Sequence, residues 1–127
     1  MEISNRCRKN CFYCGLRRDS ASVDRYTIPP EEILEALEGG YRLGLRSFLL
    51  QSGEMLGKDH IETVARLLRE CSSVIPGSRM VLSLGELPPE TYDMLREAGG
   101  DRYLLRIETS SPLLYRRYHP DDGVHSH

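Results

Sequence analysis

Three cysteines near the start of the chain are the residues best suited to chemistry. Cys7, Cys11 and Cys14 form a C-x3-C-x2-C loop, whereas Cys71 stands alone. Thiolates bind soft metal ions and iron–sulfur clusters. Disulfides are not expected, because the N-terminus lacks the apolar core of a secretion signal and a reducing cytoplasm keeps thiols free. The loop therefore predicts a metal site or a redox role in a cytoplasmic protein.

The spacing alone leaves three interpretations open: an iron–sulfur cluster, a zinc ion and chance clustering. Structural zinc usually takes four ligands in pairs, so a zinc site would need a fourth ligand from elsewhere. The candidates are Cys71, which is expected to be a buried core residue, and His60 and His119. A four-iron cluster held by three cysteines keeps one iron open for a substrate or cofactor. The spacing favours this cluster.

Three glutamates are predicted at the ends of successive strands. Glu54, Glu86 and Glu108 follow or end the apolar runs 46–50, 80–84 and 103–107. In parallel α/β folds the carboxyl ends of the strands form the ligand-binding face. We therefore expect these carboxylates to lie near the cysteine loop, which follows a first short strand over residues 1–4.

The elements that must position these residues alternate between strand and helix. Proline followed by acidic residues predicts helices that begin near residues 30 and 89. The apolar stripe over residues 61–71 predicts another helix, and Ser111-Pro112 begins a last helical turn or two. This alternation predicts an α/β fold with about four parallel strands and helices on the outer face.

Several sequence strings resemble one enzyme superfamily. The C-x3-C-x2-C loop with an aromatic residue, Tyr13, before its last cysteine resembles the radical S-adenosylmethionine (SAM) enzymes. Other strings are more similar to the HydE family, which matures the active-site cluster of FeFe hydrogenases, than to the methylornithine synthase and biotin synthase families. These strings are residues 2–5, 14–19, 51–54, 82–86 and 101–109.

The resemblance implies a role for individual residues in a partial (β/α) barrel. Cys7, Cys11 and Cys14 would bind a 4Fe–4S cluster whose fourth iron is chelated by SAM. The aromatic ring of Tyr13 would contact the adenine of SAM. The strand-end element Ser52, Gly53 and Glu54 would also contact SAM, with Glu54 near its ammonium. Glu108 would face its ribose or methionine part. An anionic group in the barrel would be held by Arg106 and Arg102.

The implied reaction is reductive cleavage of SAM to a 5′-deoxyadenosyl radical. The resemblance implies a small-molecule or small iron-complex substrate and an electron donor such as ferredoxin or flavodoxin. The alternatives are a methylornithine synthase-like or biotin synthase-like enzyme, and a non-catalytic half-barrel that binds a metal ion. Arg106, in an otherwise apolar strand, is expected to face an anion, either a ligand or a buried partner.

The resemblance covers residues 1–120, interpreted as the N-terminal half of a radical-SAM barrel. Residues 121–127, with His125 and His127, are expected to be a disordered tail, and a second chain could complete the barrel. Seventeen basic and nineteen acidic residues give a net charge of −2, so no basic field points to nucleic acid. No apolar run approaches the roughly 18–20 residues that span a bilayer, so no membrane partner is expected.

Overall fold

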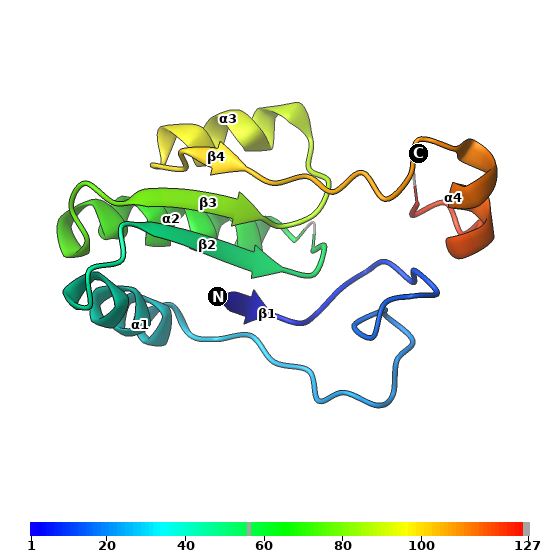
Figure 1. The fold of residues 1–127 in the computed structure, drawn as a ribbon, viewed down its shortest axis with the longest axis horizontal. Coiled ribbons are helices and arrows are strands. Elements are labelled where there is room, and N and C mark those ends of the chain that lie inside the picture. The colour runs from blue at the N-terminus through cyan, green and yellow to red at the C-terminus, as the bar shows by residue number, and fades with distance from the viewer. Residues whose placement is uncertain (56, 126–127) are drawn as a thin grey trace.

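A computed structural model describes residues 1–55 and 57–125. Four parallel strands form one sheet in chain order, β1-β2-β3-β4 (Figure 1). They are β1 (Glu2–Ser4), β2 (Ser47–Ser52), β3 (Arg79–Ser83) and β4 (Arg102–Tyr103). The predicted number, order along the chain and parallel arrangement of the strands are confirmed.

Helices alternate with the strands along the chain, as predicted. They are α1 (Pro30–Arg42), α2 (Lys58–Val74), α3 (Pro89–Glu97) and α4 (Pro112–Tyr118). The first three helices pack in a row, α1 against α2 and α2 against α3. α1 and α3 begin with proline at the first helical position and glutamate in the first turn, which suits the positive end of the helix dipole.

The hydrophobic core lies between this helical layer and one face of the sheet. The α2 stripe is buried from Ile61 to Cys71, which includes Val64, Leu67 and Leu68. On the strands, alternate residues such as Leu50 and Leu82 are buried, whereas their neighbours Leu49 and Val81 are only partly buried. Parallel sheets are usually covered on both faces. The helical layer therefore covers one face more completely than the other.

The last strand is shorter than predicted. β4 comprises only Arg102 and Tyr103, and residues 104–107 form an exposed irregular segment instead of a strand. Within the described residues, β4 lies at the sheet edge and pairs only with β3, so it has ladder hydrogen bonds on one side. Arg106 was expected to lie within an apolar strand and to face an anion there. The strand position is wrong, because Arg106 is exposed outside any strand.

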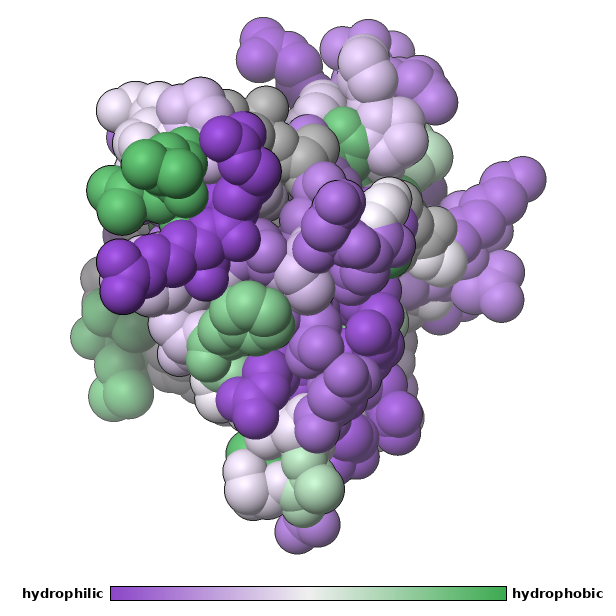
Figure 2. All heavy atoms as spheres, turned by 90° about the vertical axis from the view of Figure 1, so that its right-hand side faces the viewer, coloured by the Kyte–Doolittle hydropathy of each residue, from purple (hydrophilic) through white to green (hydrophobic). Residues whose placement is uncertain are grey.

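The carboxyl ends of the strands share one side of the molecule. The cysteine loop and α4 lie on that side, at the right of Figure 1. Figure 2 faces the same side, which is mostly hydrophilic with separate hydrophobic patches. None of the helices in the described residues is long and apolar enough to cross a membrane.

Candidate functional site

Glu54 joins the sheet to the cysteine loop. It follows β2, and only 7% of the residue is exposed. Its Oε2 accepts a hydrogen bond from the Glu86 backbone N–H at 2.9 Å, so the ends of β2 and β3 meet at this carboxylate. Its backbone carbonyl accepts from the Arg8 N–H at 2.9 Å. Two of the three predicted strand-end glutamates and the cysteine loop are therefore brought together.

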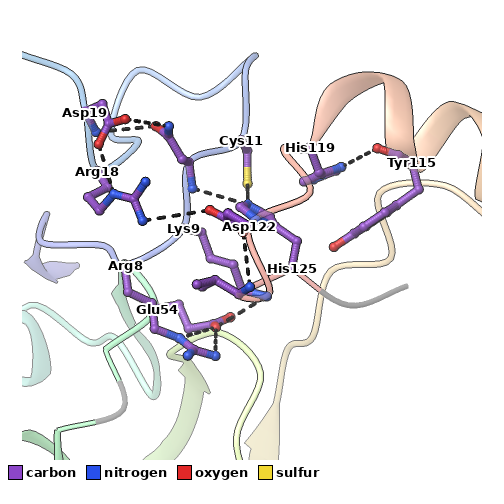
Figure 3. Close-up of polar contacts among 12 residues, drawn as sticks. Arg8, Lys9, Cys11, Arg18, Asp19, Glu54, Tyr115, His119, Asp122 and His125 are labelled. Atoms are coloured by element: carbon purple, nitrogen blue, oxygen red, sulfur yellow. Dashed lines mark hydrogen bonds and ion pairs between the residues drawn. The ribbon is translucent and has the colours of Figure 1, made fainter.

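Two basic side chains of the cysteine loop neutralise this buried carboxylate (Figure 3). Arg8 Nη2 lies 2.9 Å from Glu54 Oε1, to which Arg8 Nε also donates at 3.0 Å. Lys9 Nζ lies 3.5 Å from the same oxygen and 3.7 Å from Glu86 Oε2. A buried charge requires such partners, because transfer out of water is costly. No pattern in the sequence distinguishes Arg8 and Lys9 from other charged residues, because their partner Glu54 lies more than forty positions along the chain.

Two glycines allow the loop and the strand ends to approach closely. A Cβ on Gly53 would lie 2.3 Å from the Arg6 carbonyl oxygen and 2.7 Å from Cys7 Cβ. Gly85 has φ +88°, and a Cβ there would lie 2.5 Å from Glu54 Cγ. Only glycine fits such distances without displacing its neighbours. Gly53 therefore fixes how near the first cysteine lies to β2.

A single arginine holds much of the irregular loop in shape. The Arg25 guanidinium donates to the carbonyls of Asn5 at 2.7 Å, Leu16 at 2.9 Å and Arg17 at 2.6 Å. Asn5 is itself buried and donates to the Asp24 carbonyl at 2.7 Å. These contacts replace the regular hydrogen bonds that an irregular segment lacks. No motif in the sequence indicated them.

All three loop cysteines are free and partly exposed. The Cys14 N–H donates to the Cys11 carbonyl at 3.0 Å, so a tight turn brings these two residues together. Burial raises the pKa of the Cys11 thiol, and the charges of Cys14 and Cys7 raise it further. Within the described residues, no three His, Cys, Asp or Glu side chains are already arranged to hold a metal ion.

These thiols fit an iron–sulfur cluster. The three cysteines of a cubane each bond a different iron, so their sulfurs need not converge on one point. All three lie on one loop that Arg8 and Lys9 anchor at the strand ends, and each of the three cysteines is partly exposed. The donor set therefore suits the cluster that the sequence favoured.

Tyr13 belongs to an aromatic group at the same side of the molecule. The residue is 52% exposed, and its hydroxyl lies 3.2 Å from His119 Nε2. Its ring meets that of Tyr118 edge-on, with centroids 6.5 Å apart. Burial raises the pKa of the Tyr13 phenol, and the charges of Cys11 and Glu108 add to this effect. The charge of Glu108 thus acts on Tyr13, although Glu108 is exposed and lies outside any strand.

The remaining predicted site residues are less closely associated. Ser52 Oγ donates to the Gly53 carbonyl at 2.7 Å and lies 3.5 Å from His60 Nε2. Arg102 is exposed on β4, and Arg106 is exposed beyond it. The cysteines, Tyr13 and Glu54 are therefore linked by contacts at the cysteine loop. Arg102 and Arg106 are exposed on and after β4.

The segment expected to be a disordered tail contacts the cysteine loop in its described part. His125 Nε2 lies 3.6 Å from Cys11 Sγ, and His125 Nδ1 lies 2.8 Å from Asp122 Oδ1. Residues 126–127, with the second tail histidine, lie outside the described residues. In the sequence, only the two histidines near the end hinted at a role for this segment. No local pattern predicts that residues 121–125 fold back onto the cysteine loop.

Comparison with known proteins identifies the family. The family model described as the Radical SAM superfamily matches residues 1–124. The chain belongs to the radical SAM superfamily. Radical SAM proteins generally bind a 4Fe–4S cluster and SAM, and use small-molecule substrates and electron donors. The recognition made from the sequence motifs is thereby confirmed at the level of the superfamily.

Within the radical SAM superfamily, the chain is more similar in sequence to some relatives than to others. The chain is 45% identical over 123 residues to the FeFe-hydrogenase maturase subunit HydE of Thermotoga maritima, covering 95% of this chain and 34% of HydE. It is 29% identical over 106 residues to biotin synthase of Staphylococcus aureus, covering 82% of this chain and 32% of that enzyme. The chain thus spans about a third of the length of these curated relatives.

Solved structures agree on the fold of this radical SAM chain. The FeFe-hydrogenase maturase HydG from Carboxydothermus hydrogenoformans superposes with a TM-score of 0.85 at 25% identity, over 95% of this chain and 28% of HydG. Methylornithine synthase superposes with a TM-score of 0.82 at 23% identity, over 95% of this chain and 36% of that protein. The predicted fold class, part of a radical-SAM barrel, is confirmed.

Proposed function

We propose that this chain carries the cluster loop and part of the SAM site of a radical SAM enzyme of the HydE type. Residues 1–120 would form the N-terminal half of its barrel. The observation that carries the proposal is the contact of Glu54 with Arg8 of the cysteine loop, which holds three free thiols beside the strand ends. HydE is favoured over biotin synthase because the identity is 45% against 29%.

In this proposal each residue has a physical task. Cys7, Cys11 and Cys14 would hold the 4Fe–4S cluster. When reduced, such a cluster supplies the electron that cleaves bound SAM to a 5′-deoxyadenosyl radical. The exposed ring of Tyr13 offers a flat surface against which an adenine can stack. Glu54 offers a buried carboxylate suited to a ligand ammonium, which would replace Lys9 as its partner.

The other residues would complete the site at its rim. Ser52 and Gly53 would line the SAM site beside Glu54, and Glu108 would face the ribose or methionine part. Arg102, exposed on β4, and Arg106, exposed in the irregular segment after it, would bind an anionic part of the substrate. The substrate would be a small molecule or a small iron complex, and a ferredoxin or flavodoxin would donate the electron. Further strands would complete the barrel.

Anaerobic reconstitution tests the proposal. The chain incubated with ferrous iron and sulfide should bind about four irons, and dithionite should produce the electron paramagnetic resonance (EPR) signal of a reduced cubane. SAM should change that signal by binding the open iron. Cys11→Ser should lose the cluster, whereas the matched variant Cys71→Ser should keep it, since Cys71 lies in the helical core. Equal cluster content in both variants would contradict the proposal.

A further inference from the structure

His119 is a buried histidine at the carboxyl end of α4 to which the proposed function gives no role. Only 6% of the residue is exposed. Its Nε2 lies 3.2 Å from the Tyr13 hydroxyl, although the two residues are 106 positions apart in the chain. The two rings meet edge-on, with centroids 5.4 Å apart. The end of α4 thus places an imidazole against the residue that is proposed to contact adenine.

The second nitrogen of His119 sets the direction of its hydrogen bond to Tyr13 (Figure 3). His119 Nδ1 lies 2.8 Å from the Tyr115 carbonyl oxygen, which can only accept. In the neutral ring Nδ1 therefore carries the hydrogen, and Nε2 presents a lone pair. The Tyr13 hydroxyl donates to that lone pair. A buried nitrogen thereby holds the tyrosine oxygen in one place.

Further contacts join the end of α4 to the same part of the cysteine loop. The Phe12 backbone N–H donates to the Tyr118 carbonyl at 2.9 Å, and the Tyr118 ring meets the Tyr13 ring edge-on. The His119 ring stacks on that of Tyr115, with centroids 3.9 Å apart and planes 13° apart. His119 is thus itself fixed, so the position of its Nε2 depends on the helix and not on solvent.

A fixed ring is an advantage at a ligand site. Tyr13 is 52% exposed in an irregular loop, so burial alone does not hold its ring. A side chain that is ordered before the ligand arrives loses less conformational freedom on binding. Supporting hydrogen bonds behind a contact residue provide such order. The His119 hydrogen bond supplies this support from the buried side of the ring.

We propose that His119 is a positioning residue for SAM. It accepts the hydrogen bond of the Tyr13 hydroxyl and so holds the Tyr13 ring in the orientation that receives the adenine. This inference rests on the proposed function, from which it takes the contact between Tyr13 and adenine. His119 acts through Tyr13 and does not itself touch SAM.

Cys11 competes with His119 for the same hydroxyl. The Tyr13 side chain also forms a hydrogen bond with Cys11, and a cluster-bound cysteine sulfur can only accept. The hydroxyl carries a single hydrogen, and sulfur is a weaker acceptor than an imidazole nitrogen. The balance therefore favours His119, and an experiment must separate the two acceptors.

Nitrogen-15 NMR of the full chain, labelled at histidine, tests the hydrogen bond without cluster or SAM. His119 should show the tautomer with hydrogen on Nδ1. Tyr13→Phe should shift the His119 Nε2 resonance, because the donor is lost. Tyr118→Phe is the matched control, since the Tyr118 hydroxyl has no hydrogen-bond partner among the described residues, and it should leave that resonance in place.

SAM binding to the cluster-loaded chain, followed by the EPR change, tests the positioning role. His119→Phe keeps a ring beside Tyr115 and removes the acceptor, while the Tyr115 carbonyl keeps the His119 backbone N–H at 3.1 Å. The dissociation constant for SAM should rise about 3- to 10-fold, as for loss of one hydrogen bond. His119→Gln, whose side-chain oxygen can accept, should restore the affinity to within about twofold.

A double-mutant cycle links the effect to the Tyr13–His119 pair. Tyr13→Phe should weaken SAM binding by a similar factor, and adding His119→Phe should cause no further loss, because both substitutions remove the same hydrogen bond. Iron content per chain should be unchanged in all these variants. Tyr118→Phe should bind SAM like the unsubstituted chain.

Three outcomes would overturn the positioning role. They are an unshifted His119 resonance in Tyr13→Phe, unchanged SAM affinity of His119→Phe at equal iron content, and additive losses in the double variant. Weaker SAM binding in Tyr13→Phe with none in His119→Phe would assign the hydroxyl to Cys11 instead. If the unsubstituted chain assembles no cluster, or its signal ignores SAM, the proposed function fails, and the NMR shift still decides whether His119 holds Tyr13.

Discussion

The four cysteines differ in their surroundings, and this difference separates structural from ligand roles. Cys71 is 2% exposed on the inner stripe of α2, and burial raises the pKa of its thiol to about 11. Cys7, Cys11 and Cys14 are partly exposed on the loop. The prediction that Cys71 is a core residue is confirmed. Cys71 is almost inaccessible as well as weakly ionised, so it is a poor nucleophile and a poor ligand, because both roles require an accessible thiolate.

Thiol alkylation should therefore distinguish Cys71 from the loop. With iodoacetamide at pH 8, the metal-free folded chain should label Cys7, Cys11 and Cys14, and Cys71 should label at least 100-fold more slowly, because its thiolate fraction and its access are both small. Mass spectrometry of timed digests measures this. In denaturant, all four should label at similar rates. Fast labelling of Cys71 in the folded chain would contradict its buried position.

At the scale of elements, the cysteine loop is positioned by its contact with the end of β2. Gly53 lies against the backbone of Arg6 and the side chain of Cys7, and Glu54 pairs with Arg8 directly afterward. Two consecutive residues after β2 thus hold the loop: Gly53 packs against it, and Glu54 forms an ion pair with it. The string 51–54, which resembles the family, contains both Gly53 and Glu54. In the structure, Gly53 allows the loop to approach closely, and Glu54 forms an ion pair with Arg8.

Substitution at Gly53 tests this packing. Gly53→Ala would place a methyl group 2.3 Å from the Arg6 carbonyl oxygen, so the loop must shift. We expect a loss of about 1 to 3 kcal/mol in the free energy of unfolding, as for other overpacked sites. Gly39→Ala is the matched control, because Gly39 lies in α1 and a Cβ there meets nothing within 4 Å.

The control should raise the free energy of unfolding by roughly 0.5 to 1 kcal/mol, since alanine favours helix over glycine. Urea denaturation followed by circular dichroism measures both changes. Equal stability of Gly53→Ala and the unsubstituted chain would show that the loop does not depend on this close approach.

At the scale of the whole molecule, the β4 edge and the segment after it expose apolar side chains. Ile107 is 84% exposed, Leu105 is 50% exposed and Leu104 is 43% exposed. A contiguous exposed apolar surface typically marks a place where further protein packs. This agrees with the proposal that other strands complete the barrel, because the solved relatives extend well beyond the part that this chain matches.

The apolar segment should cause self-association of the isolated chain. Sedimentation velocity should show the average mass rising with protein concentration, and Ile107→Ser should shift that rise to several-fold higher concentration. Leu43→Ser is the matched control: Leu43 is 87% exposed and directly follows α1. In Figure 1, α1 lies at the left, whereas the segment after β4 runs to the right. An equal effect of both substitutions would assign association to general surface hydrophobicity instead.

Local patterns in the sequence determined the elements and the family. The apolar spacing of α2, the Pro-Glu starts of α1 and α3 and the cysteine motif all depend on residues a few positions apart. Such patterns reflect helix and strand periods, which neighbouring residues set by themselves. They were sufficient to predict four parallel strands and to predict that Glu54 and Glu86 meet near the cysteine loop.

Only the tertiary structure decided which side chains of distant segments touch. The pairing of Glu54 with Lys9, the support of the loop by Arg25, the shortness of β4 and the approach of His125 to Cys11 depend on the path of the chain. The three contacts join residues far apart in the chain, and the sequence around one partner does not predict the other. Burial and charge compensation arise only once the chain has folded.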